Sequence, residues 1–341
     1  MRAVLHSATM SELADRVLEV ACEAGRAAAR VCRAVLTEAP ANPEAMSKLG
    51  KEPVTVADYG SQAVILRAIA AAFPDHGVIA EEGSAHLRAS AGDKASAQIV
   101  RVVGEALGEP ADFEQVCAWI DHQGSGGTEF TWCVDPIDGT KGFLRREQFA
   151  VAIGLLRGGK PWAGVLVCPH LPVHASNADG PRGVLFAAVA GHGTTVAPLS
   201  RGAAIPARAS EHTGADRVRV LGSVESEHGD PALVRAVIDH LGLRGGMVRI
   251  DSQAKYACVA RGDAEVYLRP RSRPDYREKV WDHAAGVIVC EEAGGKVTDL
   301  DGKPLDFTFG RTLQDNRGVL ATNGYLHTRV LASLRVAEAA G

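Results

Sequence analysis

The chain has 341 residues, of which 46% are hydrophobic, and a formal net charge of −4. This length is enough for a large buried core and indicates one large domain or two smaller ones. The slightly acidic charge excludes the basic footprint of a nucleic-acid-binding protein and gives no polybasic membrane signal. No run approaches the roughly 18 apolar residues that a membrane helix requires.

The cysteines indicate a reducing compartment. The chain has 7 of them, an odd number, and none forms a Cys-x-x-Cys pair. Reduced thiols of this kind are typical of cytoplasmic proteins. No apolar core follows Arg2, so we expect no signal peptide. The expectation is a cytoplasmic protein without nucleic-acid or membrane partners.

Two helices are predicted near the start of the chain. Residues 11–37 are alanine-rich with apolar residues at helical spacing, which indicates a long amphipathic helix. Apolar residues also recur at helical spacing after Asp58, so Asp58 is expected at the N-cap of the second helix. Its carboxylate has two open interpretations: a cap alone, or a group held at a helix start that faces a site.

A short strand, Val78–Ala80, ends at Glu81-Glu82. Because adjacent strand residues point to opposite faces, only one of these acids can face a given site. Residues 85–128 are polar and weakly helical, and we expect a surface insertion or flap. The glycine-rich residues 124–127 are predicted to form a flexible joint.

The central motif of the chain runs from Trp132 to Phe143. An apolar run ends at Asp135, and a proline turn leads to Asp138 and a predicted helix start. The two acids therefore lie at the ends of consecutive elements, close enough to bind the same cation. Gly139 allows close approach to a ligand, helix-start amides bind phosphate, and carboxylates suit hard cations. The motif predicts a site for Mg²⁺ with a phosphate, with an acidic helix cap as the alternative.

The following segments suggest two domains. Residues 149–156 and 162–168 predict a β-hairpin, and 169–181 has the composition of a domain junction. We therefore expect an N-terminal α+β domain, 1–172, and a C-terminal α/β domain, 173–341. The predicted strands and helices of the second domain alternate, at 184–189, 218–222, 231–241, 247–251, 254–260 and 266–268.

Two further segments near residue 280 could contribute to a site. Residues 269–279 are locally basic, which suits either a solvated loop or a surface that attracts a polyanion. Trp281-Asp282 then opens a predicted helix that ends at Gly294-Gly295. Asp282 is thus another acid at the start of an element.

Taken together, these segments resemble the inositol monophosphatase superfamily, the lithium-sensitive, Mg²⁺-dependent phosphatases. Glu81-Glu82, Asp135–Thr140 and Trp281-Asp282 follow in that family's order. The longer strings are similar to its 3'(2'),5'-bisphosphate nucleotidase branch, of the longer yeast and plant type, at 53–59, 138–145, 251–256 and 280–286. The resemblance spans roughly residues 45–325 and implies an α/β fold, a five-layer α-β-α-β-α sandwich.

The resemblance also implies a site for two to three Mg²⁺ ions. Its ligands would be Glu81, Asp135, the Ile137 carbonyl, Asp138 and Asp282, with Asp58 beside a third, weaker ion. The implied catalytic residues are Asp58, Thr140 and Glu81, with Asp58 bonded to the Thr140 hydroxyl and orienting the attacking water. Paired metals acidify water and neutralise charge on both oxygens of the displacement, so no cysteine or histidine nucleophile is required.

The implied substrate site lies in the cleft between the two domains. The Gly139 and Thr140 amides would bind the scissile phosphate. The nucleotide and its second phosphate would contact His228, Ser252, Lys255 and Arg269. The chain departs from the pattern of the branch at Gly50, at 127–131 and at Arg146, which stands where Gly is common.

The implied reaction is hydrolysis of the 3'-phosphate of adenosine 3',5'-bisphosphate to AMP and phosphate, in sulfur metabolism. 3'-Phosphoadenylyl sulfate is an additional candidate substrate. One alternative is inositol polyphosphate 1-phosphatase or inositol monophosphatase activity. Another, of a different class, is a non-catalytic nucleotide-binding sensor, which would tolerate loss of an acid. We expect a monomer or a small homo-oligomer.

Overall fold

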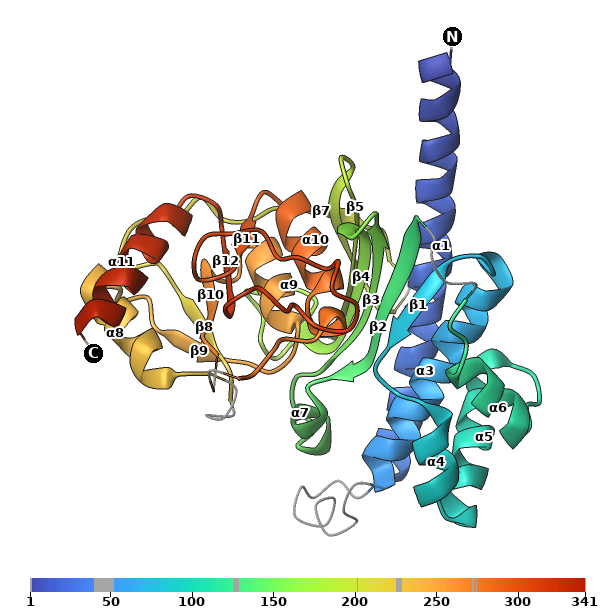
Figure 1. The fold of residues 1–341 in the computed structure, drawn as a ribbon. Coiled ribbons are helices and arrows are strands. Elements are labelled where there is room, and N and C mark those ends of the chain that lie inside the picture. The colour runs from blue at the N-terminus through green and yellow to red at the C-terminus, as the bar shows by residue number, and fades with distance from the viewer. Residues whose placement is uncertain are drawn as a thin grey trace.

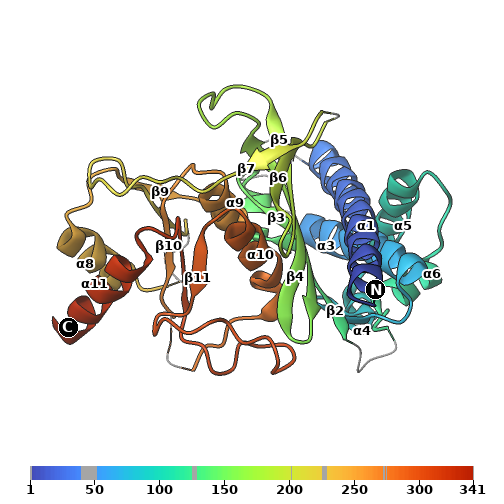
Figure 2. The ribbon, with the colours of Figure 1, turned by 90° about the horizontal axis from the view of Figure 1, so that it is seen from above.

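The computed structural model describes residues 2–39, 52–124, 129–200, 202–224, 229–271, 273 and 275–340. Within these residues the strands form a 7-stranded and a 5-stranded sheet. Figures 1 and 2 show the two sheets separated by one layer of helices and flanked by helices on both outer faces. The predicted five-layer α-β-α-β-α sandwich is confirmed.

The first outer layer is built on α1 (Arg2–Glu38) and α3 (Glu52–Ala72). The amphipathic pattern of α1 is confirmed, because Val17, Val31 and Val35 are buried in the core that α1 shares with α3 and the first sheet. The predicted N-cap position of Asp58 is wrong. The helix α3 begins before Asp58, because Pro53 lies in its first turn, where a backbone N–H has no hydrogen-bond partner within the helix. Asp58 therefore lies inside the helix.

Residues 84–120 form three more helices of this layer. They are α4 (Ser84–Ser90), α5 (Asp93–Leu107) and α6 (Phe113–Ile120). Ile99, Val102 and Val103 of α5 are fully buried in the same core as α3. The prediction of a surface insertion is therefore wrong for these helices: their few apolar residues fall on one face and suffice for packing. Residues 125–128, with most of the predicted glycine joint, lie outside the described residues.

The first sheet has the order β1-β2-β3-β4-β5-β6-β7, with β1 parallel to β2 and the other neighbours antiparallel. Its strands are β1 (Gly77–Ala80), β2 (Phe130–Asp138), β3 (Ala150–Arg157), β4 (Lys160–Pro172), β5 (Arg182–Val189), β6 (Gly193–Pro198) and β7 (Ile205–Ala207). The predicted β3–β4 hairpin is confirmed. The expected junction at 169–181 is instead a connection within this sheet, and β5 to β7 complete it.

The second sheet has the order β11-β12-β10-β8-β9. Its strands are β8 (Val220–Gly222), β9 (Met247–Arg249), β10 (Val266–Arg269), β11 (Lys296–Thr298) and β12 (Val319–Thr322). The helices α8 (Pro231–Leu241) and α11 (His327–Ala340) pack on its outer face. Among the helices described, none combines the length and apolar composition needed to cross a membrane.

The middle helical layer contains α9 (Ala254–Ala260) and α10 (Ala284–Glu292). Two glycines allow α10 to lie directly on the first sheet. A Cβ on Gly154 would come within 2.8 Å of the Ala284 Cβ, and one on Gly164 within 2.5 Å of Ile288. The 3-10 helix η2 (Val280–Asp282) leads into α10, so this close packing also brings Asp282 beside the first sheet.

Candidate active site

A cavity of about 760 Å³ lies where the end of β2 and the helix α7 (Thr140–Leu144) meet the loops of the second sheet. It brings together most of the predicted site residues: Glu81, Asp135, Ile137, Asp138, Gly139, Thr140, Ser252, Lys255, Arg269 and Asp282. Asp58 is buried and does not line the cavity. The predicted residue His228 lies outside the described residues.

The acids of the cavity repel one another. Burial, and then the charges of Glu81, Asp138 and Asp282, raise the pKa of Asp135 well above its ordinary value. Burial and Asp138 likewise raise the pKa of Asp282. The Glu81 side chain is open to solvent at the rim, yet burial of its carboxyl group and the neighbouring Glu82 raise its pKa to about 7. A bound cation would relieve this repulsion.

The strand end itself positions Asp135 and Asp138. The pairing of β2 with β3 shifts register between these two residues, so the chain bulges at the Pro136 turn. The Ile137 N–H donates to Asp135 Oδ1 at 3.1 Å, which fixes that carboxylate. Asp138 accepts a hydrogen bond from the Gln253 N–H, and this bond ties the end of β2 to the start of α9.

Gly139 and Thr140 begin α7 at the cavity wall. Gly139 has φ 90°, the left-handed region that favours glycine, and an added Cβ would lie 3.0 Å from the Ser252 Cβ. The Thr140 hydroxyl donates to the Ile137 carbonyl at 3.4 Å in this structure, whereas the resemblance implied a bond to Asp58. Burial, followed by Glu81 and Glu82, raises the pKa of Asp58 well above its usual value.

One of the two adjacent glutamates faces the cavity, as the strand pattern predicts. Glu81 lines it. Glu82 is held by Gln62, which donates to the Glu82 carbonyl at 2.8 Å and accepts from its N–H at 3.0 Å. Arg311 was not predicted as a site residue, yet it donates to the Glu81 carbonyl at 3.3 Å and lies 4.4 Å from the ring centroid of Trp281.

Lys255 and Arg269 form the cationic wall of the cavity. Lys255 is buried and donates to the Ile250 carbonyl at 3.0 Å. Burial lowers its pKa to about 8, although the nearby Asp138 acts in the opposite direction. An Arg269 Nη2 lies 2.9 Å from Glu278 and 3.9 Å from Asp282. A ligand in the cavity therefore meets acids on one side and fixed cations on the other.

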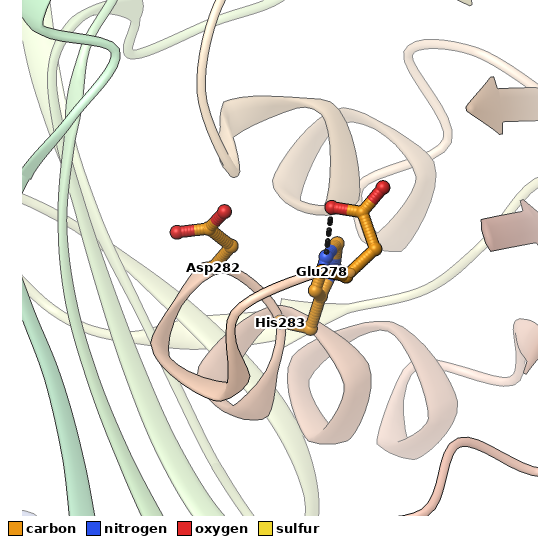
Figure 3. Close-up of side chains that lie close together, drawn as sticks. All are labelled: Glu278, Asp282 and His283. Atoms are coloured by element: carbon orange, nitrogen blue, oxygen red, sulfur yellow. Dashed lines mark hydrogen bonds and ion pairs between the residues drawn. The ribbon is translucent and has the colours of Figure 1, made fainter. Parts of the chain in front are cut away.

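Glu278, Asp282 and His283 place ligand atoms within 4.8 Å of one another (Figure 3). His283 contacts Glu278 through Nε2 at 3.1 Å and Tyr256 through Nδ1 at 2.8 Å. In Figure 3 the Asp282 carboxylate stands apart from this pair. Glu278 and His283 thus already have protein partners, which leaves Asp282 as the acid of this group available to a metal.

Sequence reasoning missed Glu278 as a functional residue. Burial alone would raise its pKa, but Arg269 and His283 outweigh burial and lower the pKa to about 2. The available signal was an acid within the basic stretch 269–279, just before Trp281-Asp282. Asp275 and Glu278 are the two acids of this stretch, and each is a candidate partner for one of its arginines.

The inositol monophosphatase family matches residues 13–339. A 3'(2'),5'-bisphosphate nucleotidase of Emericella nidulans is 39% identical over 332 residues, which cover 88% of this chain and 94% of the relative. One from Oryza sativa is 38% identical over 335 residues, covering 93% of each. The solved inositol monophosphatase of Anabaena superposes with a TM-score of 0.60 at 28% identity, covering 94% of this chain and 95% of that one.

Proposed function

The chain belongs to the inositol monophosphatase family of metal-dependent phosphatases, and we propose that it hydrolyses the 3'-phosphate of adenosine 3',5'-bisphosphate to AMP and phosphate. The observation that carries the proposal is the two-sided cavity, with clustered acids at the end of β2 and fixed cations at Lys255 and Arg269. A substrate with two phosphates can use both sides at once. 3'-Phosphoadenylyl sulfate, with its own 3'-phosphate, is a second substrate of the proposal.

We propose Mg²⁺ as the metal, because the cavity offers carboxylate and carbonyl oxygens, the ligands that hard cations prefer. The proposed ligands are Glu81, Asp135, the Ile137 carbonyl, Asp138 and Asp282, with Asp58 beside a third ion. Their raised pKa values support this fit, because acids that resist ionising together gain from a cation. When bound, Mg²⁺ would acidify water and offset charge on the attacking and leaving oxygens.

The chain's own groups would orient the reactants. In the proposal the Gly139 and Thr140 amides bind the scissile phosphate at the start of α7. Asp58 and Thr140 orient the attacking water, with Glu81 beside them. Ser252, Lys255 and Arg269 bind the nucleotide and its second phosphate, and His228 remains a predicted contact. The substrate thus bridges the acids of the N-terminal half and the cations of the C-terminal half.

Two alternatives remain to be separated by experiment. Inositol polyphosphate 1-phosphatase or inositol monophosphatase activity would use the same acids with another substrate. A non-catalytic nucleotide sensor would not need the complete acid set that the cavity contains. We also propose a cytoplasmic location, since the cysteines of the chain are free thiols.

The test is phosphate release with Mg²⁺ from three substrates, with and without millimolar lithium. The substrates are adenosine 3',5'-bisphosphate, inositol 1-phosphate and inositol 1,4-bisphosphate, with Asp138→Asn as the inactive control. We expect fast, lithium-sensitive release from the nucleotide that is lost in the variant. Preference for an inositol phosphate would retain the chemistry but reject the substrate. Tight nucleotide binding without turnover of any substrate would favour the sensor.

A further inference from the structure

A second cavity, of about 950 Å³, is lined by residues of α1, β4 and β5. The helix α1 packs on these two strands (Figure 2). The charged lining of the cavity is almost entirely basic: Arg26, Arg30, Arg33, Arg146 and Arg182, with the imidazole of His170 beside them. Among its described lining residues, the acid is Glu23. We call this space the arginine cavity. None of its residues has a role in the proposed reaction.

Among the described residues, the hydrogen bonds of these arginines go mainly to backbone carbonyls. Arg26 donates to the Leu199 carbonyl at 2.6 Å, Arg30 to the Ala106 carbonyl at 3.0 Å, and Arg182 to the carbonyls of His170 and Ala178 at 2.8 Å. A carbonyl orients a guanidinium without cancelling its charge, and each guanidinium has five N–H donors. The Arg26–Glu23 ion pair is 3.9 Å long and the glutamate is 71% exposed, so it offsets little of the charge.

His170 lies in the positive field of these arginines. Burial is the largest cause of its lowered pKa, and hydrogen bonds to the backbone of Glu147 and Arg146 act in the opposite direction. The charges of Arg182 and Arg146 then lower the pKa further. A net charge of −4 for the whole chain makes this local excess of positive charge notable. A concave site with such a field concentrates anions.

The spacing of the arginines favours an anion with more than one charged group. Arg26, Arg30 and Arg33 follow one face of α1. At about 1.5 Å of rise per residue, the first and last of them are separated by about 10 Å along the helix. A row of guanidinium groups can contact more oxygens of a molecule with two or more phosphates than of a single phosphate. The cavity volume also suits a small molecule.

A smaller cavity of about 670 Å³ connects the lining of the arginine cavity with that of the active site. It shares Arg146, His170 and Arg182 with the former and Asp251 with the latter. Arg146 has φ 58° and donates to the carbonyls of Leu36 and Ala39 at 2.6 and 2.7 Å. Its neighbour Arg145 pairs with Asp251. The basic lining is therefore preorganised and lies beside, but outside, the acidic cavity.

We propose that the arginine cavity is a second binding site, separate from the active site, for a small soluble anion that carries two or more phosphate groups. The guanidinium groups bind the phosphates, and the hydrogen bonds to backbone carbonyls keep those groups in place before binding. Because bidentate arginine contacts suit phosphate oxygens, charge reversal at the rim of the cavity is the most direct way to test it.

The experiment is calorimetric titration of the full chain with inorganic pyrophosphate in EDTA, at low and at physiological ionic strength. Without metal, the acids of the active site disfavour a polyanion, so the arginine cavity is the expected binding site. Three matched variants each reverse one exposed arginine. Arg33→Glu lies in the arginine cavity, Arg273→Glu at the active-site cavity, and Arg16→Glu on α1 outside both.

We expect one pyrophosphate per chain, at least about tenfold weaker binding in Arg33→Glu, and wild-type binding in the other two variants. Orthophosphate should bind more weakly than pyrophosphate to the wild type. The proposal is wrong if pyrophosphate does not bind at millimolar concentration. It is also wrong if Arg273→Glu or Arg16→Glu weakens binding as much as Arg33→Glu does. Thermal melting of each variant confirms that it is folded.

Discussion

Asp135 and Glu278 are two almost fully buried acids that line the active-site cavity, yet their pKa values move in opposite directions. The surroundings of Asp135 are other acids, and its pKa is raised. Those of Glu278 include Arg269 and His283, and its pKa is lowered to about 2. Burial acts in the same direction on both. The difference comes from whether the protein itself supplies the positive charge.

This comparison distinguishes two parts of the cavity lining. The Glu278 side is neutralised by the chain and can hold Arg269 rigidly against a ligand. The acid cluster around Asp135 lacks enough fixed positive charge, and this is the property expected of a metal site before the metal binds. Four experiments test the comparison, and we give them from the largest expected effect to the smallest.

The first removes one charge from the acid cluster. Asp135→Asn should lower kcat by about 10²–10⁴-fold, because losing one partner of a buried charge interaction costs about 3–5 kcal/mol. In EDTA the same variant should melt at a higher temperature than the metal-free wild type, since one source of repulsion is gone. Steady-state kinetics and thermal melting measure the two effects. A metal-free variant less stable than wild type would contradict the repulsion argument.

The second removes the charge of Glu278. Glu278→Gln leaves the Arg269 guanidinium without its carboxylate at 2.9 Å, and we expect a loss of about 3 kcal/mol in the free energy of unfolding. KM for adenosine 3',5'-bisphosphate should rise more than kcat falls, because Arg269 is proposed to bind substrate. Adenosine 3'-monophosphate, which lacks the second phosphate, is the matched control and should show a smaller change in KM. Equal changes for both substrates would limit Glu278 to a structural role.

The third varies pH and metal together. The pKa of Glu81 is raised from 4.5 to about 7, so the folded, metal-free protein holds this proton more tightly than the unfolded chain. The associated stability is fully present below pH 4.5 and is lost as the pH rises through about 7. Mg²⁺ binds the ionised acids, so its effect should grow over the same range. Thermal melting should show a larger shift with Mg²⁺ at pH 8 than at pH 5, and an equal shift would contradict this reasoning.

The fourth removes Arg311, a cation at the edge of the acid cluster. Its contacts with Trp281 and with the Glu81 carbonyl are exposed, and its charge lowers the pKa of Glu81. A cation–π contact of this kind contributes about 0.5–1 kcal/mol, which corresponds to about a two- to fivefold effect. Arg311→Met should therefore lower the equilibrium constant for folding by that factor, measured by chemical denaturation in EDTA. Lys303→Met, which removes an exposed positive charge outside the lining of the active-site cavity, serves as the comparison.

Local chemistry made much of the fold and of the acid cluster predictable. Asp135, Asp138 and Asp282 each follow or begin an element that the sequence pattern identifies, and folding places all of them at one cavity. Glu278 was not predictable in this way, because its role depends on Arg269 and His283, which become its partners only in the folded chain. Secondary-structure propensity depends on the residues of one segment, so it carries little information about partners that come together only in the folded chain.

The errors in the fold have the same origin. Of the strands β5 to β7, the sequence pattern predicted β5. The sheet that a strand joins depends on long-range pairing, which the pattern does not contain. Residues 84–120 looked solvated because their apolar residues are few, yet α5 buries them on one face. Arg146 shows the reverse case, since its φ of 58° lies in the left-handed region that favours glycine, and the resemblance implied glycine at this position.

The close packing of α10 on Gly154 and Gly164 has a consequence for synthesis on the ribosome. Glu81, Asp135 and Asp138 emerge early, but Asp282 emerges about 150 residues later and reaches them only when α10 docks on the first sheet. Domains formed early in a chain fold while the rest is still being made. A nascent chain can therefore present the first three acids before the proposed metal site is complete, since Asp138 still lacks its bond from the Gln253 N–H and Asp282 has not yet been added. Full affinity for the metal is then expected only of the finished chain.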